Sequence, residues 1–452
     1  MPNRFRVSVV ALLMAVVLPA CAVCAAEPKQ GSALAKMAKE VAKEVEALRG
    51  WTFKKPVANR FTTPAEVRQY LEREVAEQMP PDRIHRVATF LRMVGLVPND
   101  CDLTRTFLDL LEEQVGGYYD SETKALRLVD RGQPMPPLVQ RVMLAHELTH
   151  ALDDQYVDLD AFLKGLTGKT EDMDLVAMSV VEGSATALMT RYMARATLSG
   201  RFDVGDVQAY ANREVARSRK MLESPRYFTA MLGAYVCGMQ FLCHGDPMAM
   251  IGGKGETVGK HMLAATKEPP RSMEQILHPE KYWDDAMRDD PVVLDDEAVT
   301  RILEGDGRWV VHTDTLGELL TAILTTPPGV RPSLVSMGVA SMWTNDGAAG
   351  WGGDRFYLVA SGSDSAAAAR DPKQPRGLWL TVWDTPRDRD EFRRTYERRP
   401  PQTPRAVVPF GNLGAAVLFG FGQDEAEAMV DRLRKVALPM TRAGKPWSPW
   451  AL

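Results

Sequence analysis

Residues 146–150 read His146-Glu147-Leu148-Thr149-His150, and the interpretation of the whole chain starts from this stretch. The surrounding residues 138–156 contain strong helix formers and neither proline nor glycine, which predicts a helix. Positions four apart on a helix lie on one face, so His146 and His150 would present two imidazoles to one metal ion. Glu147 would stand beside that ion as a base for water. The spacing therefore predicts a catalytic metal centre, and the alternative is a surface helix with two unrelated histidines.

A carboxylate for the third ligand position occurs further along the chain. Glu182 lies in the middle of residues 174–189, which are strongly apolar and predict a buried helix. A lone ionised carboxylate is costly there unless it is paired or bound to a metal. Catalytic zinc commonly takes two histidines and one glutamate and keeps a fourth position for water. We therefore expect Zn²⁺ held by His146, His150 and Glu182, in a helix that packs closely at Gly183.

Other histidines compete for the third ligand position. They are His244, His261 and His278, and a single histidine of this kind is more often structural than a ligand. The longer motif that adds a glycine and a third histidine after H-E-x-x-H is excluded, because Asp153 and Tyr156 stand at those two positions.

Length and composition fit a folded protein of ordinary type. A chain of 452 residues is long enough for two or three domains, and 45% hydrophobic with 25% charged residues is typical of globular chains. The formal net charge of −4 gives no reason to expect a nucleic-acid partner.

Residues 1–26 predict a signal peptide. Arg4 and Arg6 precede a short apolar run, and small residues follow it up to Ala26. The run is too short for a transmembrane helix, and we expect none later in the chain. The pattern indicates export to the periplasm or the extracellular space. Residues 18–21 (LPAC) are also similar to a bacterial lipoprotein signal, so a lipid anchor at Cys21 and an outer-membrane location stay open.

Residues 1–26 contain Cys21 and Cys24, and the three cysteines that remain, Cys101, Cys237 and Cys243, are odd in number. A bridge from Cys101 to one of the other two is one interpretation, and three buried small hydrophobic residues are the alternative.

Coarse secondary structure divides the chain in two. Amphipathic helices are predicted at 30–50, 63–79, 82–96 and 102–115, followed by a half-buried strand at 124–130. The acidic residues 283–300 predict a solvated linker at a domain boundary, and their spacing does not fit a calcium loop. Beyond it, strands and helices alternate, and residues 351–355 (WGGDR) predict a tight turn before a strand.

H-E-x-x-H followed by a glutamate on a later helix resembles the gluzincin zinc metallopeptidases. A more specific resemblance, to a group of exported bacterial predicted peptidases of unassigned substrate, rests on residues 117–120 (GYYD), 145–155 (AHELTHALDDQ), 181–186 (VEGSAT), 275–282 (QILHPEKY), 316–318, 350–355 and 383–385. The resemblance implies His146, His150 and Glu182 as zinc ligands and Glu147 as general base.

The resemblance also implies an α+β fold with a mostly helical, zincin-like (thermolysin-like) catalytic domain. We expect a signal peptide at 1–26, an N-terminal helical segment at 27–95, the metallopeptidase domain at 96–285 and a smaller α+β domain of unknown role at 286–452.

Two positions depart from the gluzincin pattern. Thr186 stands where many gluzincins have an aspartate that orients a ligand histidine, and Asp153 stands where a glutamine is expected. Asp153 or Asp154 is therefore a candidate for that orienting role.

Tyr235 is the candidate for stabilising the oxyanion of a tetrahedral intermediate. The spacing Tyr235-x-x-Gly238 is similar to the segment that carries the catalytic tyrosine in the aminopeptidase N family, and a core aromatic residue is the alternative. The motif that anchors a free N-terminus in that family is absent, so we do not predict an aminopeptidase.

The predicted function is zinc-dependent hydrolysis of peptide bonds in a peptide or protein substrate, with the strand at 124–130 pairing with an extended substrate. One alternative is a zinc amidohydrolase acting on cell-envelope material. Another is an exported binding or scaffold protein, against which the intact Glu147 argues, because a structural site has no need of a base.

Overall fold

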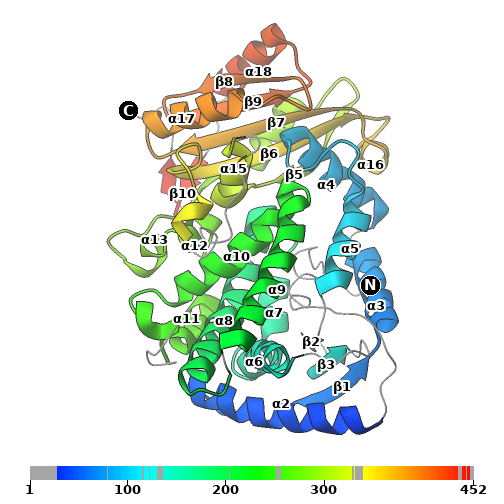
Figure 1. Ribbon diagram of the computed structural model, residues 1–452. Coiled ribbons are helices and arrows are strands. Elements are labelled where there is room, and N and C mark those ends of the chain that lie inside the picture. The colour runs from blue at the N-terminus through cyan, green and yellow to red at the C-terminus, as the bar shows by residue number, and fades with distance from the viewer. Residues whose placement is uncertain are drawn as a thin grey trace.

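The computed structural model describes residues 28–78, 80–114, 117–121, 123–129, 136–202, 204–250, 256–327, 330, 340–435, 440–443 and 445–447. The predicted signal peptide and Cys21 lie outside these residues. The chain is an α+β protein, as the sequence predicts, with a helical part below a five-stranded sheet in the view of Figure 1. Cys101, Cys237 and Cys243 are all free thiols.

The four predicted N-terminal helices form, and further helices follow them along the chain. In chain order they are α2 (Pro28–Arg49), α3 (Pro64–Gln78), α4 (Pro81–Val94), α5 (Leu103–Gln114), α6 (Pro137–Asp154), α7 (Leu159–Leu166), α8 (Glu171–Leu198), α9 (Val204–Glu223), α10 (Arg226–Leu242), α11 (Glu256–Lys267), α12 (Met273–Leu277) and α13 (Glu280–Trp283). Helix α3 starts with a reciprocal cap, because Thr63 Oγ1 accepts from the Glu66 N–H and Glu66 accepts from the Thr63 N–H.

A small sheet lies beside α6. Its strands are β1 (Ala58–Thr62), β3 (Ala125–Val129) and β2 (Gly117–Asp120), in the order β1-β3-β2. β3 runs parallel to β1 and antiparallel to β2. The expectation that the strand at 124–130 pairs with substrate is therefore wrong, because β3 is the middle strand and both of its edges are already hydrogen-bonded.

The large sheet is antiparallel and has the order β5-β6-β7-β9-β8. Its strands are β5 (Arg308–Asp314), β6 (Trp351–Ser361), β7 (Lys373–Trp383), β8 (Arg405–Phe410) and β9 (Gly414–Phe419). The helices beside it are α14 (Asp296–Leu303), α15 (Gly317–Thr325), α16 (Ser365–Arg370), α17 (Pro386–Glu397) and α18 (Gln423–Lys435).

Alternate residues of the large sheet enter two different cores. In β7, Trp379 and Trp383 join the main core with α15 and α17, whereas Leu378 and Leu380 join a second core with α14 and α18. Residues 351–355 are not the predicted turn, because they are the first residues of β6. A Cβ at Gly353 would come within 2.5 Å of the Val292 carbonyl, so glycine is needed where the neighbouring backbone approaches.

The acidic segment 283–300 is not the solvated linker that we predicted. It contains β4 (Val292–Leu294), which pairs with β10 (Met440–Arg442) in a third sheet of order β11-β10-β4 with β11 (Lys445–Trp447), and it enters α14. Two of its carboxylates are bound by arginines: Arg442 binds Asp289, and Arg271 binds Asp290 at 3.1 Å. Long-range ion pairs therefore fold this segment onto distant parts of the chain.

Helices α8 and α10 form the tightest helix contact around the site. A Cβ at Gly183 in α8 would lie 2.2 Å from the Gly238 carbonyl carbon in α10, and a Cβ at Gly238 would lie 1.9 Å from the Ser179 oxygen. The two backbones touch, as the small residues around Gly183 predict. Among the described residues, no helix has both the length and the apolar character that a bilayer span requires.

Candidate metal centre

Helix α6 places the two predicted histidine ligands as the motif spacing requires. It begins at Pro137, where the missing N–H and the fixed φ of proline suit the first helical position. His146 and His150 are 2% and 5% exposed, and their rings meet edge to face with centroids 4.8 Å apart. The two Nε2 atoms lie 3.1 Å apart, so both rings direct the same nitrogen toward one point.

Helix α8 brings Glu182 to the same point. The helix starts with Thr170 as its cap, which accepts from the Met173 N–H, and Glu182 is fully buried. Glu182 Oε2 lies 3.1 Å from His146 Nε2 and 3.6 Å from His150 Nε2. The three ligand atoms lie within 4.8 Å of one another. The structure therefore joins the two residues of the motif to the third ligand that was predicted from burial.

The electrostatics of this group favour a cation. Burial would raise the pKa of Glu182, but His150 and His146 outweigh it and lower the pKa to about 2. Burial would lower the pKa of His150, but the Glu182 carboxylate raises it to about 9. The buried oxygen Glu182 Oε1 accepts no hydrogen bond from the described residues. An ionised carboxylate with a spare lone pair and two imidazole nitrogens is a donor set that fits zinc.

Glu147, the predicted base, lies beside these ligands with 2% of its surface exposed. Its Oε2 accepts a 2.8 Å hydrogen bond from the backbone N–H of Tyr119 in β2. Burial raises the pKa of Glu147 to about 8, and the Glu182 carboxylate adds to this while His150 opposes it. A carboxyl group with a pKa near neutrality can both accept and return a proton.

The two aspartates that follow the motif have other partners than a ligand histidine. Asp153 binds Arg49 and Ser184, and Asp154 accepts from the Tyr119 hydroxyl at 2.7 Å. Lys124 also pairs with Asp154, at 2.7 Å. The charge of Asp153 still acts on the site, because it is one of the carboxylates that raise the pKa of His150.

Tyr235 lies at the site, next to His146. The two rings are nearly parallel, at 14°, with centroids 6.4 Å apart. Two of the three competing histidines are engaged elsewhere, and His244 is not in the metal group. His261 Nδ1 donates to the Leu242 carbonyl at 2.8 Å, and His278 Nε2 lies 3.0 Å from Glu318.

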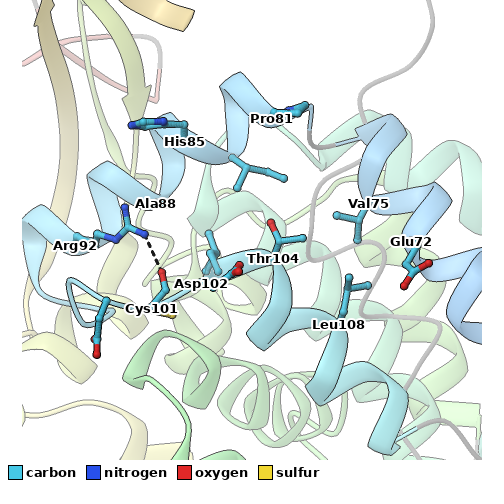
Figure 2. Close-up of a pocket in the computed structure, with 13 residues that line it drawn as sticks. Glu72, Val75, Pro81, His85, Ala88, Arg92, Cys101, Asp102, Thr104 and Leu108 are labelled. Carbon is cyan, nitrogen blue, oxygen red and sulfur yellow. Dashed lines mark hydrogen bonds between the residues drawn. The ribbon is translucent and has the colours of Figure 1, made fainter. Parts of the chain in front are cut away.

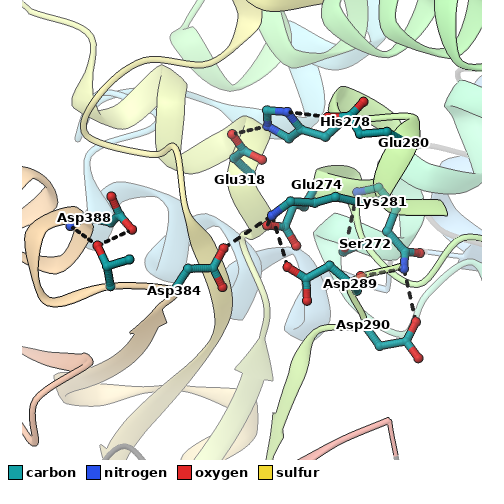
Figure 3. A network of polar contacts seen from close by, with 12 residues as sticks. Ser272, Glu274, His278, Glu280, Lys281, Asp289, Asp290, Glu318, Asp384 and Asp388 are labelled. Atoms are coloured by element: carbon teal, nitrogen blue, oxygen red, sulfur yellow. Dashed lines mark hydrogen bonds and ion pairs between the residues drawn. The ribbon is translucent and has the colours of Figure 1, made fainter. Parts of the chain in front are cut away.

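A second group of acidic residues has ligand-like spacing. The carboxylates of Glu274, Asp289 and Asp384 also lie within 4.8 Å of one another. Figure 3 shows that the Lys281 ammonium lies between them, at 2.6 Å from Glu274, 3.1 Å from Asp289 and 3.3 Å from Asp384. Arg442 contacts Asp289 and Asp384 as well. The protein thus supplies its own cation here, and this group has no need of a metal.

A pocket of about 810 Å³ lies between α3, α4 and α5 (Figure 2). Its lining includes Val75, Ile84, Ala88, Leu103 and Leu108, together with polar residues such as His85 and Arg92. None of the lining residues belongs to the metal group, so this pocket is separate from the candidate centre.

Sequence reasoning missed two residues of the centre. Tyr119 falls in the stretch 117–120, which carried a resemblance but no assigned role. Arg49 is a basic residue in the last turn of α2, where a cation interacts favourably with the helix dipole. The residues around it in the sequence give no sign that it is buried.

A family model matches the part of the chain that contains most of the large sheet. Residues 307–408 match the family model described as "Domain of unknown function (DUF8575)". This range runs from β5 into β8 and contains none of the residues of the metal centre. No curated protein and no solved structure matches the chain.

Proposed function

We propose that the protein is a zinc-dependent metallopeptidase of the gluzincin type, with His146, His150 and Glu182 as the zinc ligands. The observation that carries this proposal is the convergence of the three ligand atoms within 4.8 Å, in a buried site that also contains Glu147. A structural metal site gains nothing from a buried carboxylate beside its ligands, whereas a hydrolase requires a base at that place.

The chemistry divides between the metal and the chain. Bound zinc would supply Lewis acidity, which polarises a scissile carbonyl and lowers the pKa of a water molecule. Glu147 accepts the proton of the attacking water and then donates it to the leaving amine. The Tyr119 N–H holds the Glu147 carboxylate for this task. Tyr235, beside His146, donates its hydroxyl proton in a hydrogen bond to the developing oxyanion.

We extend the proposal to the zincin-like character of residues 96–285, in which the motif helix, strands β2 and β3 beside it and a later helix with the glutamate ligand surround the centre. The substrate is a peptide or protein that is cleaved internally. The enzyme acts outside the cytoplasm, as the signal-like residues 1–26 predict, either free or anchored at Cys21.

A Glu147→Gln variant tests the proposed chemistry. It keeps the three ligands and removes the base, so we expect zinc content equal to that of the wild type and cleavage of a peptide library reduced by at least about a hundredfold. Equal activity of variant and wild type would exclude Glu147 as the base. Activity on peptidoglycan-derived amides but not on the peptide library would favour the envelope amidohydrolase instead.

A further inference from the structure

Arg49, the last residue of α2, is a buried cation beneath the metal centre. Only 1% of its surface is exposed, although isolated charges are rarely buried without partners. Its guanidinium donates to Asp153 in α6 and to Ser184 Oγ in α8, the latter at 2.5 Å. Ser184 in turn donates to Asp153 at 2.5 Å. The three side chains form a closed triangle that joins α2, α6 and α8, and we call it the Arg49 triangle.

Two members of the Arg49 triangle are close in sequence to the proposed ligands, on the same helices. Asp153 follows His150 by about one turn of α6. Ser184 follows Glu182 by two positions, which is about 200° around α8 at 3.6 residues per turn. Gly183, between them, faces the opposite way and touches Gly238 in α10. Glu182 and Ser184 therefore flank the line along which α8 meets α6, with Glu182 at the histidines and Ser184 at Asp153.

We propose that Arg49 is a positioning residue of the metal centre: its contacts fix the turn of α6 after His150 against the turn of α8 that carries Glu182. The inference rests on the proposed zinc ligation by His146, His150 and Glu182. Apolar packing alone tolerates small sliding of one helix along another, whereas directional hydrogen bonds between charged groups set one register. Metal affinity depends on that register, because the ligand atoms must meet within a few tenths of an ångström.

The residues that follow Arg49 also contact the end of α6. Arg49 lies 4.9 Å from the centre of the Trp51 ring, which stacks on Tyr156 just past the end of α6 at 4.3 Å. Lys54 donates to the Gln155 carbonyl. The end of α2 thus contacts the end of the motif helix at several points beyond the Arg49 triangle.

The test measures the zinc affinity of the full chain by competition with a chromophoric chelator, and the absorption spectrum of the Co²⁺-substituted protein. Arg49→Met is expected to weaken zinc binding by about 10- to 100-fold, as loss of a ligand-supporting residue does, and to change the Co²⁺ spectrum. Arg49→Lys keeps the charge, and its zinc affinity is expected to lie between those of the wild type and Arg49→Met. Arg141→Met is the matched control, because Arg141 in α6 also pairs with α2, through Glu40, but away from the ligands; its zinc affinity should equal that of the wild type.

A double variant, Arg49→Met with Asp153→Leu, separates positioning from mere stability. It leaves no buried charge unpaired, so the denaturation midpoint should recover relative to Arg49→Met while zinc affinity stays weak. Recovery of both properties, or wild-type zinc affinity in Arg49→Met, would overturn the positioning role while the ligand assignment stands. A wild-type protein that binds neither zinc nor Co²⁺ would overturn the ligand assignment itself, and the positioning role with it.

Discussion

The backbone N–H of Tyr119 donates a 2.8 Å hydrogen bond to the carboxylate of Glu147, so strand β2 directly holds the proposed general base. The side chain of Tyr119 makes a second link to the same helix, through its hydroxyl to Asp154 at 2.7 Å. Backbone and side chain of one residue thus fix β2 against the motif helix. They serve different purposes: the N–H orients a reacting group, and the hydroxyl stabilises the packing around it.

Tyr119→Phe separates these two links. The variant keeps the backbone N–H and loses the hydrogen bond to the Asp154 carboxylate, which should lower the free energy of unfolding by about 1–3 kcal/mol in urea denaturation. Zinc content should not change. Tyr156→Phe is the control, since its hydroxyl bonds to no described residue other than Thr52, through the backbone near the surface, and its free energy of unfolding should fall by less. Loss of zinc in Tyr119→Phe would show that the hydroxyl, too, supports the centre.

Gly183→Ala tests the close contact of α8 with α10. The added methyl group would overlap the Gly238 backbone, so we expect a loss of about 1–3 kcal/mol or more in unfolding free energy. Gly165→Ala in α7 is the matched control, because nothing lies within 4 Å of its Cβ position. That control should be neutral or stabilising by up to about 1 kcal/mol. Similar effects of both substitutions would contradict the direct backbone contact.

Lys281→Met tests whether the second acidic group depends on its internal cation. Glu274 is fully buried, and the variant would leave it with Asp289 and Asp384 but without the ammonium between them. We expect a loss of about 3–5 kcal/mol in stability. Lys260→Met removes an exposed ion pair and should cost less than about 1 kcal/mol. Stabilisation of the wild type by Ca²⁺ at this group would refute the reading that Lys281 already fills it.

Asp120 gives a prediction for pH. Burial alone would raise the pKa of Asp120, but hydrogen bonds from Thr123 and from Arg127 outweigh it and lower the pKa below its usual value. A folded pKa below the unfolded one stabilises the protein above the unfolded value, about 3.9, and that contribution is lost as the pH falls through the folded value. The stability difference between wild type and Asp120→Asn should therefore stay constant from pH 7 to about pH 5 and shrink as the pH falls below about 4 in denaturant titrations. A difference that did not shrink would contradict the lowered pKa.

The parts of the site that follow from local spacing could be predicted from the sequence. His146 and His150 lie on one helix face because they are four apart, and Glu182 stood out because apolar residues surround it on the same helix. Each of these two features depends only on residues within one helix, α6 for the histidines and α8 for Glu182. The α+β character of the C-terminal part followed similarly from the alternation of helical and strand patterns there.

The parts that depend on distant partners could not be predicted. The strand at 124–130 looked like a free edge, but its partner β1 (Ala58–Thr62) comes from a remote part of the chain. Residues 283–300 looked solvated because Arg442, which binds Asp289, lies far along the sequence. Arg49 could not be assigned a role because neither Asp153 nor Ser184 is near it in sequence.

Metal analysis of the purified mature protein tests the central claim most directly. Elemental analysis by inductively coupled plasma mass spectrometry should find about one zinc per chain in the wild type, the stoichiometry expected for one tetrahedral site. The Glu182→Ala variant should retain its fold by circular dichroism and lose most of this zinc, because Glu182 is the proposed ligand that lies outside the motif, within 4.8 Å of both histidine nitrogens. A wild type that contains no zinc after reconstitution, or a Glu182→Ala variant that retains the full amount, would contradict the assignment.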